Sequence, residues 1–236
     1  MFGRTNQATV KLLNRAGYDV LTPAGQVCCG ALYAHSGKLA DARESARRNL
    51  AAFEKLELDA IITNAAGCGS TLKEYGHLLA DDPESAERAT AFSAKVKDLT
   101  EFLIACPGLL DSLRITDQAS RIAYHDACHL AHAQRITKPP RDLVKAVAGD
   151  RFVELPESDV CCGSAGTYNL TEPEMAERLQ RRKIDNLLQT GAHIVVTTNP
   201  GCILQIQAGL QKAGAGHIRV LHIADYLMEF SPPPGE

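Results

Sequence analysis

The chain has 236 residues, a formal net charge of −3 and 45% hydrophobic residues. These values suit one large or two small globular domains that bury a core without disulfide bonds. The weak negative charge gives no electrostatic footprint for nucleic acid or anionic lipid, and no apolar run approaches the ~20 residues that span a bilayer. Because the first residues also carry no secretory signal pattern, we expect a cytoplasmic protein without a transmembrane segment or a nucleic-acid partner.

In chain order, the pattern of apolar residues, prolines and glycines predicts alternating helices and strands. Helices are predicted at residues 2–16, 37–56, 71–79, 85–104, 130–134, 140–148, 173–190, 202–212 and 223–230. Strands are predicted at residues 18–22, 60–63, 121–124, 152–155, 194–198 and 217–221, and a proline tail at 232–234. Strands that alternate with helices indicate parallel sheets, so the predicted fold class is α/β.

The sequence contains an internal repeat. Val27-Cys-Cys-Gly30 matches Val160-Cys-Cys-Gly163, and Gly67-Cys68 matches Gly201-Cys202. The first pair of motifs is displaced by 133 residues and the second by 134, so the two halves run in register to within one residue. We therefore predict a tandem duplication, in which each repeat is a small parallel sheet flanked by helices.

The first repeat is predicted at residues 1–106 and the second at 119–236, with a linker at 107–118. The predicted helix at 85–104 has no evident counterpart in the second half, and we interpret it as part of the bridge between the halves. Cys128 precedes the second Cys-Cys-Gly motif by 33 residues, and the same step back from Cys28 falls before the first residue. We therefore expect an amino-terminal truncation that removes the first repeat's leading strand and first cysteine.

The chain has eight cysteines, and in the cytosol thiols stay reduced, which favours metal ligation over a disulfide framework. Adjacent cysteines on a regular strand point to opposite faces, but the nearby glycines allow the chain to curl and turn both sulfurs inward. Each distal Gly-Cys lies between the end of a strand and the start of a helix, where α/β sheets bind ligands and helix N-termini lower thiol pKa values.

The second repeat supplies four candidate ligands, Cys128, Cys161, Cys162 and Cys202. Four thiolates suit a [4Fe–4S] cluster, and a zinc site or inert buried thiols are the alternatives. The first repeat supplies three candidate ligands, Cys28, Cys29 and Cys68, for a second cluster. Cys106 has no partner in the repeat and is expected to be a buried structural thiol.

Three histidines lie near these motifs. His125 and His129 flank Cys128, and His35 follows the first Cys-Cys-Gly motif. Each is either a hydrogen-bond donor that tunes a cluster or a satisfied core side chain. The basic residues Arg178, Arg181, Arg182 and Lys183 are interpreted as a solvated helix face. No Ser-His-Asp set, Walker loop or flavin fingerprint is visible, so we expect no catalytic residue.

The cysteine pattern resembles the cysteine-rich Cys-Cys-Gly domain. This domain occurs as a pair in the B subunit of heterodisulfide reductase, in lactate-utilisation iron–sulfur proteins and in the iron–sulfur subunit of glycolate oxidase. The stretches Cys29-Gly-Ala-Leu-Tyr-Ala-His35, Asn64-Ala-Ala-Gly-Cys-Gly69 and Cys161-Cys-Gly-Ser-Ala-Gly-Thr-Tyr168 are most similar to the last of these. The heterodisulfide reductase pattern ends in Cys-x-x-Cys, whereas this chain has Ala65 and Asn199 at the first of those positions.

The resemblance implies an electron-transfer subunit. It implies a flavoprotein partner that oxidises glycolate or a related 2-hydroxy acid, an iron–sulfur cluster that passes electrons toward a quinone-linked acceptor, and a place in the cytoplasm or peripherally on the cytoplasmic face of the inner membrane. It also implies an amino-terminal ferredoxin-like segment in the complete subunit. Two other functions remain open: thiol and disulfide redox chemistry like that of heterodisulfide reductase, and a zinc-stabilised assembly domain.

Overall fold

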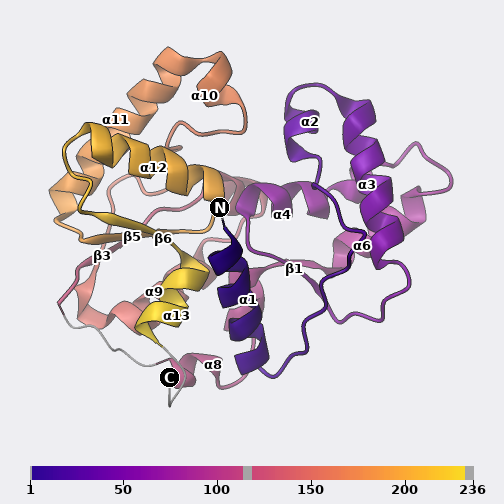
Figure 1. The fold of residues 1–236 in the computed structure, drawn as a ribbon, viewed down its shortest axis with the longest axis horizontal. Helices are drawn as coiled ribbons and strands as arrows, with labels where there is room; N and C mark the ends of the chain where they lie inside the picture. Colours follow the sequence, from indigo (N-terminus) through magenta and orange to yellow (C-terminus); the bar gives the residue numbers. More distant parts are fainter. Residues whose placement is uncertain (1, 114–118, 232–236) are drawn as a thin grey trace.

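The computed structural model describes residues 2–113 and 119–231. Residues 114–118 of the predicted linker and the predicted tail at 232–234 lie outside the described residues. The chain forms two lobes, one built on each repeat (Figure 1). Within the described residues, no helix is both long and apolar enough to cross a membrane.

The second repeat is built on a four-stranded parallel sheet with the strand order β4-β3-β5-β6. Its strands are β3 (Ile122–Tyr124), β4 (Phe152–Val153), β5 (Ile194–Thr197) and β6 (Arg219–His222). Its helices are η1 (His129–Ala133), α9 (Lys138–Ala148), η2 (Gly149–Arg151), α10 (Tyr168–Thr171), α11 (Pro173–Thr190), α12 (Pro200–Lys212) and α13 (Ile223–Phe230). All of β5 is buried, as its uncharged β-branched sequence predicts for a central parallel strand.

The two faces of this sheet bury different cores because successive side chains of a strand point to opposite sides. Ile122 and Tyr124 join a core with α9 and α13, whereas Ala123 joins a core with α11 and α12. Val196 and Val195 on β5 divide between the two cores in the same way.

The first repeat is smaller, with a two-stranded parallel sheet of β1 (Ile61–Thr63) and β2 (Val96–Asp98). Its helices are α1 (Gly3–Arg15), α2 (Ala31–His35), α3 (Leu39–Phe53), α4 (Ala66–Lys73), α5 (Tyr75–Leu78), α6 (Ala86–Lys95) and α7 (Leu99–Ile104). A further short helix, α8 (Leu109–Ser112), lies in the predicted linker. Leu50, Tyr75, Leu79 and Phe92 form the centre of its own core.

The two lobes also share a core. Leu12 of α1 and Leu103 of α7 are fully buried in the same cluster as Leu227 of α13. The Thr5 hydroxyl donates a 2.6 Å hydrogen bond to Asp225, which ties α1 to α13, and the two helices lie side by side (Figure 1). The lobes are therefore packed together by apolar burial and by specific contacts.

The α/β class and the parallel sheets are confirmed, but three local predictions are wrong. Residues 18–22 form no strand. In the second repeat β4 pairs with β3, but the described residues of the first repeat contain no strand equivalent to β3 with which residues 18–22 could pair. The predicted helix at 85–104 is interrupted by β2. The predicted helix at 71–79 is replaced by two helices, α4, which begins at Ala66, and α5.

The interruption at β2 also corrects the interpretation of 85–104 as a bridge. β2 pairs with β1 and leads into α7, just as β6 pairs with β5 and leads into α13. Asp98 and His222 occupy the same position, and each side chain accepts a hydrogen bond from the backbone N–H two residues further on. This segment therefore closes the first repeat, and the duplication extends further than the cysteine motifs.

Candidate metal centre

The second Cys-Cys-Gly loop depends on Gly163. Its φ angle is 91°, a left-handed conformation that glycine adopts without strain. A Cβ atom here would lie 2.3 Å from the carbonyl oxygen of Ala176, so no larger residue fits without movement. The backbone N–H of Gly163 donates to the Cys161 sulfur at 3.3 Å, and Cys162 points into the core with 1% of its surface exposed. The loop thus brings both sulfurs to one place.

Cys202 lies in the first turn of α12, directly after the loop that follows β5. Contact with the Cys162 thiol is the largest cause that lowers the pKa of Cys202 far below its ordinary value. The amide of Asn199 also donates to the Cys202 sulfur, at 3.6 Å. Backbone N–H groups at a helix N-terminus favour a thiolate in the same way.

Cys128 completes a continuous chain of contacts among the four thiols. Contact with Cys161 raises the pKa of Cys128, while the Cys128 and Cys162 thiols together lower the pKa of Cys161 to about 2. Contacts with Cys161 and Cys202 raise the pKa of Cys162. When neighbouring thiols are in contact, those that keep their protons stabilise the thiolates of the others, so Cys161 and Cys202 ionise more readily than Cys128 and Cys162. Thiolates are the donors that iron–sulfur clusters and zinc prefer.

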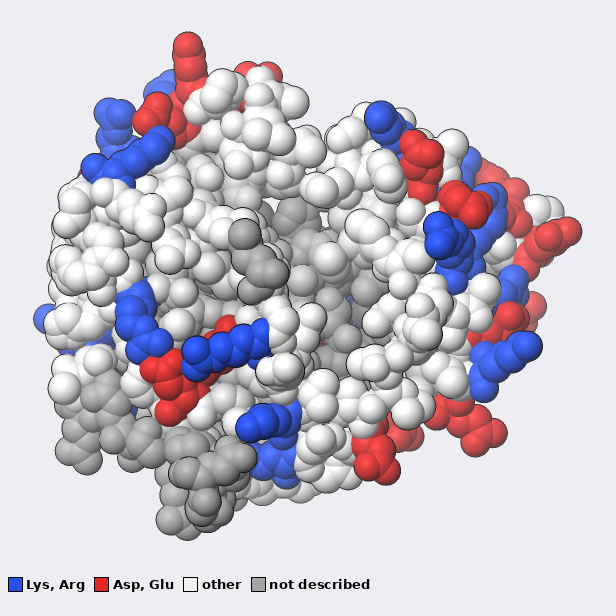
Figure 2. Space-filling view, in the orientation of Figure 1, with Lys and Arg blue, Asp and Glu red and all other residues white. Residues whose placement is uncertain are grey.

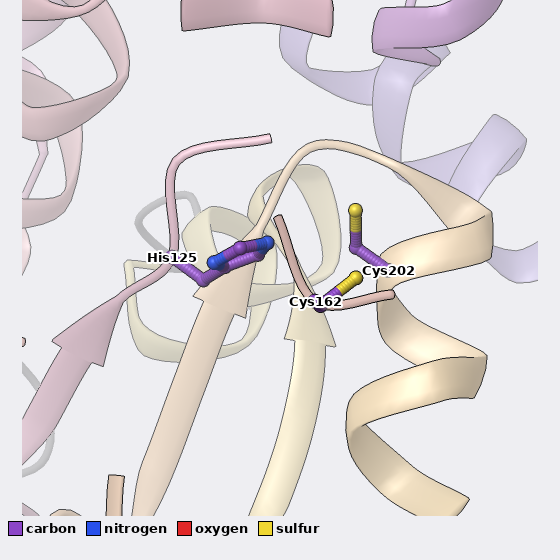
Figure 3. Close-up of side chains that lie close together, drawn as sticks. All are labelled: His125, Cys162 and Cys202. Carbon is purple, nitrogen blue, oxygen red and sulfur yellow. The ribbon is translucent and has the colours of Figure 1, made fainter. Parts of the chain in front are cut away.

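His125 lies against the same sulfurs and is fully buried. One of its ring nitrogens and the sulfurs of Cys162 and Cys202 all lie within 4.8 Å of one another (Figure 3). Neither ring nitrogen has a hydrogen-bond partner within the described residues. A buried set of soft sulfur donors beside an imidazole fits a metal ion or cluster better than it fits an empty core.

Charged side chains brace the turn that precedes the second Cys-Cys-Gly loop. Lys183 of α11, only 2% exposed, donates to the backbone carbonyls of Glu157 and Ser158. Arg141 of α9 bonds the buried Asp126 at 2.6 Å and the Ser158 hydroxyl at 2.7 Å. The expectation of a solvated face is therefore wrong for Lys183, since its position inward on α11 becomes visible only when the helix is packed.

The first repeat brings Cys28, Cys29 and Cys68 together, but less deeply. Contact with Cys68 and burial raise the pKa of Cys29, and contact with Cys29 lowers the pKa of Cys68. Cys28 is exposed, Cys29 is buried and Cys68, in the first turn of α4, is partly exposed. Gly30 turns this loop with a φ angle of 83°.

Two residues that sequence reasoning missed position this first loop. Tyr75 donates to the Cys29 carbonyl at 2.8 Å, and the Asn49 amide donates to the Cys28 carbonyl at 3.2 Å and to the Tyr75 hydroxyl at 3.0 Å. Both side chains are buried although they are polar. From the sequence alone, these two residues could not be distinguished from polar residues on the exposed surface of a helix.

Cys106 lies apart from these sets. It is 6% exposed, it packs in the core shared by the two lobes, and its thiol donates to the Phe102 carbonyl at 3.3 Å. This placement agrees with the expectation of a structural thiol.

The two cysteine sets lie where the lobes meet. The rings of His35 and His129, one from each repeat, are 5.4 Å apart. The backbone N–H of Gly67, next to Cys68, donates to the Asn199 side chain at 3.2 Å. Gln134 of the second repeat donates to the Ala66 carbonyl at 2.9 Å. The helix that carries Cys68 therefore begins against the loop that carries Asn199.

Paired parallel-sheet repeats with Cys-Cys-Gly loops at the junction define a cysteine-rich protein of the metal-binding type. The chain belongs to the cysteine-rich domain family CCG, whose sequence model matches residues 1–73 and 122–207. These ranges contain all seven candidate ligands and exclude Cys106. The resemblance drawn from the cysteine motifs is confirmed.

The chain is similar to two kinds of relative. It is 46% identical over 231 residues to the "Probable glycolate oxidase iron-sulfur subunit" of Bacillus subtilis, a match that covers 97% of this chain and 52% of that protein. It is 31% identical over 231 residues to "Lactate utilization protein A" of Oceanobacillus iheyensis, covering 96% of this chain and 91% of that protein. The chain thus spans about half the length of the first relative and about nine-tenths of the second.

Proposed function

We propose that the chain is an iron–sulfur electron-transfer subunit of an oxidoreductase complex that oxidises glycolate or a related 2-hydroxy acid. The observation that carries this proposal is the convergence of the four thiols of Cys128, Cys161, Cys162 and Cys202 from separate segments. The name of the 46% identical relative, which includes glycolate oxidase and iron–sulfur, supports the substrate class and the cofactor.

In this proposal the four thiols of the second repeat hold a [4Fe–4S] cluster, which supplies one-electron storage when bound. The protein's own contribution is to exclude water from Cys162 and Cys202 and to direct N–H donors at the sulfurs. The Gly163 N–H and the Asn199 amide are two such donors. Hydrogen bonds to sulfur and burial are the means by which a protein sets a cluster's potential.

For the first repeat we propose a second, more labile cluster site at Cys28, Cys29 and Cys68. Three thiolates leave one iron of a [4Fe–4S] cluster without a protein sulfur, and Cys28 is exposed to solvent. We also keep residues 1–106 and 119–236 as the two repeats and 107–118 as the linker between them.

The electron donor in this proposal is a flavoprotein subunit, and the acceptor is quinone-linked. We propose that the flavoprotein docks at the junction of the two lobes, where the surface of this chain is hollowed (Figure 2). The helices α2 and α10 stand on either side of this hollow (Figure 1), and both carry exposed apolar residues, among them Leu32, Tyr33 and Leu170. In this view Lys, Arg, Asp and Glu gather at the upper left, along the right edge and in a group across the lower middle of the molecule, whereas the upper walls of the hollow are mostly uncharged. Such walls suit a partner that approaches the cysteine sets closely. We place the protein in the cytoplasm or peripherally on the cytoplasmic face of the inner membrane.

Zinc binding is the second candidate, favoured by the close approach of His125, Cys162 and Cys202. Anaerobic reconstitution with iron and sulfide separates the two. An iron–sulfur protein gains broad visible absorption that bleaches on reduction and about four firmly held irons for one [4Fe–4S] cluster, and more if the first repeat also loads. A colourless protein that binds one zinc and excludes iron would contradict the proposal.

Variants test the ligand set in the same experiment. Cys161→Ala, Cys162→Ala and Cys202→Ala should each lose most of the firmly bound iron. Cys106→Ala is the matched control and should keep the bound iron, because its thiol donates to a backbone carbonyl in the shared core, apart from both cysteine sets. Equal iron loss in the Cys106 variant would show that the ligand set is wrong.

A further inference from the structure

His125 is a buried polar side chain without a hydrogen-bond partner among the described residues. It is fully buried, and neither ring nitrogen makes a hydrogen bond within the described residues. A buried donor or acceptor that is left unpaired destabilises the folded protein, and most buried polar groups in native proteins are paired. A metal ion bound to a ring nitrogen would remove this cost.

The protein fixes where this ring points. His125 follows β3, and its backbone N–H donates to the carbonyl of Val196 on β5 at 2.9 Å, so the sheet holds its main chain. From there the ring lies beside the sulfurs of Cys162 and Cys202 (Figure 3). The three groups come from the end of a strand, the Cys-Cys-Gly loop and the first turn of α12.

We propose that His125 is a metal ligand of the second repeat and supplies a nitrogen beside the sulfurs of Cys162 and Cys202. The inference rests on the proposed function only in that this site holds a metal. On a [4Fe–4S] cluster, His125 would take the place of one of the four thiolates as the ligand of one iron. Sulfurs at about 2.3 Å and an imidazole nitrogen at about 2.0–2.1 Å from one tetrahedral ion lie within about 4 Å of each other. Because the three donors already lie within 4.8 Å, a closure of less than about 1 Å suffices.

Thiolate and imidazole donors together suit zinc and iron. Histidine in place of cysteine on an iron of a cluster is also known to raise its potential. His129 offers a contrast within the same loop. It is half-buried, its Nδ1 lies 3.8 Å from the Cys128 sulfur, and its ring faces His35 across the junction. His129 is therefore the matched control.

The test loads the reduced, anaerobic full chain, labelled with 15N-histidine, with 113Cd²⁺ alone. The expected result is a 113Cd resonance split by a directly bound 15N nucleus. His125→Leu should lose this splitting and at least about 10–100-fold in Cd²⁺ affinity, the range seen when supporting residues of metal sites are lost. His129→Leu should keep the splitting. The unsubstituted protein reports the ligand directly, so the proposal stays testable if the His125 variant does not fold.

Two outcomes would overturn the inference. One is Cd²⁺ bound by the wild-type chain without any nitrogen splitting, and the other is splitting that survives in His125→Leu. Failure of the proposed function would give a different experimental result. Iron and sulfide would then assemble no cluster, while the Cd²⁺ spectrum would still report whether His125 is a ligand.

Discussion

Replacement of Lys183 by methionine tests how the protein holds the second Cys-Cys-Gly loop. Glu157, in the turn before the loop, has a φ angle of 52°, a left-handed conformation that costs a non-glycine residue about 1–3 kcal/mol. The helix α11 holds this turn in place. Lys183 donates to the carbonyl oxygens of Glu157 and Ser158, and Asn186 donates to the Glu157 carboxylate at 2.9 Å.

The magnitude follows from what Lys183→Met removes. Methionine fills a similar volume, but the Glu157 and Ser158 carbonyls lose their charged donor and keep only the backbone N–H groups of Val160 and Asp126. A hydrogen bond to a charged group contributes about 1.5–3 kcal/mol. Against this, the protein no longer buries an ammonium group, whose burial lowers the pKa of Lys183. We expect a net loss of about 2 kcal/mol, or about 4–8 °C in Tm for a chain of this size.

The assay is anaerobic thermal and urea unfolding of the reduced protein without metal, followed by iron reconstitution. Arg181→Met is the matched control, because Arg181 lies on the same helix but is exposed and should change stability by no more than about 0.5 kcal/mol. The Lys183 variant should also bind iron less firmly, since the relaxed turn lies four residues before Cys161. If the Lys183 variant has the same Tm and the same free energy of unfolding as the Arg181 variant, and binds iron equally well, the turn does not depend on the Lys183 ammonium group.

Three further predictions test other parts of the structure. Gly163→Ala should destabilise the protein and weaken metal binding, because the added Cβ would lie 2.3 Å from the Ala176 carbonyl oxygen. The control is Gly214→Ala, at a glycine with a φ angle of 71° and open space around it, which should lower the free energy of urea unfolding by only about 1–2 kcal/mol through backbone strain. Burial raises the pKa of Asp98 from 3.8 to about 6, so the stability contributed by its protonated form is present below pH 3.8 and is lost as the pH rises through 6. The difference in unfolding free energy between wild type and Asp98→Asn should therefore change by up to about 3 kcal/mol between these pH values. A difference that stays constant with pH would contradict this prediction. The pure, flavin-free chain should not reduce a dye when given glycolate, since thiolate clusters carry electrons but a flavin or nicotinamide transfers hydride; substrate-dependent dye reduction would refute the electron-carrier assignment.

The sequence predicts the strongly patterned elements well. The start of α11 at Pro173 and its end before Gly191 follow from proline and glycine at the helix ends, and the helix runs from Pro173 to Thr190 as predicted. The bounds of α13 are likewise as predicted. These segments need only their own residues to be recognised, because apolar spacing and end signals are local.

Elements that depend on a distant partner could not be predicted. Val96–Asp98 is a strand only because it pairs with Ile61–Thr63, and its lysine interrupts the apolar run that a buried strand would show. Tyr18 and Val20 pack on the shared core without a neighbouring strand, although their sequence favours one. For the same reason, cysteine spacing indicates which thiols converge, whereas the roles of Asn49, Tyr75 and Lys183 emerge only from tertiary packing.

Asn199 explains why the two repeats are not equivalent at their junction. Its amide donates to the Cys202 sulfur at 3.6 Å, while its oxygen accepts from the Gly67 N–H, beside Cys68, at 3.2 Å. The corresponding residue of the first repeat is Ala65, which has no polar side chain to make the reverse contacts. One amide therefore supports the second cysteine set and also binds the start of the helix that carries Cys68. Since hydrogen bonds to sulfur raise a cluster's potential and immobilise its ligands, the duplicated motif yields two unlike sites, of which the second is the more buried and the better supported.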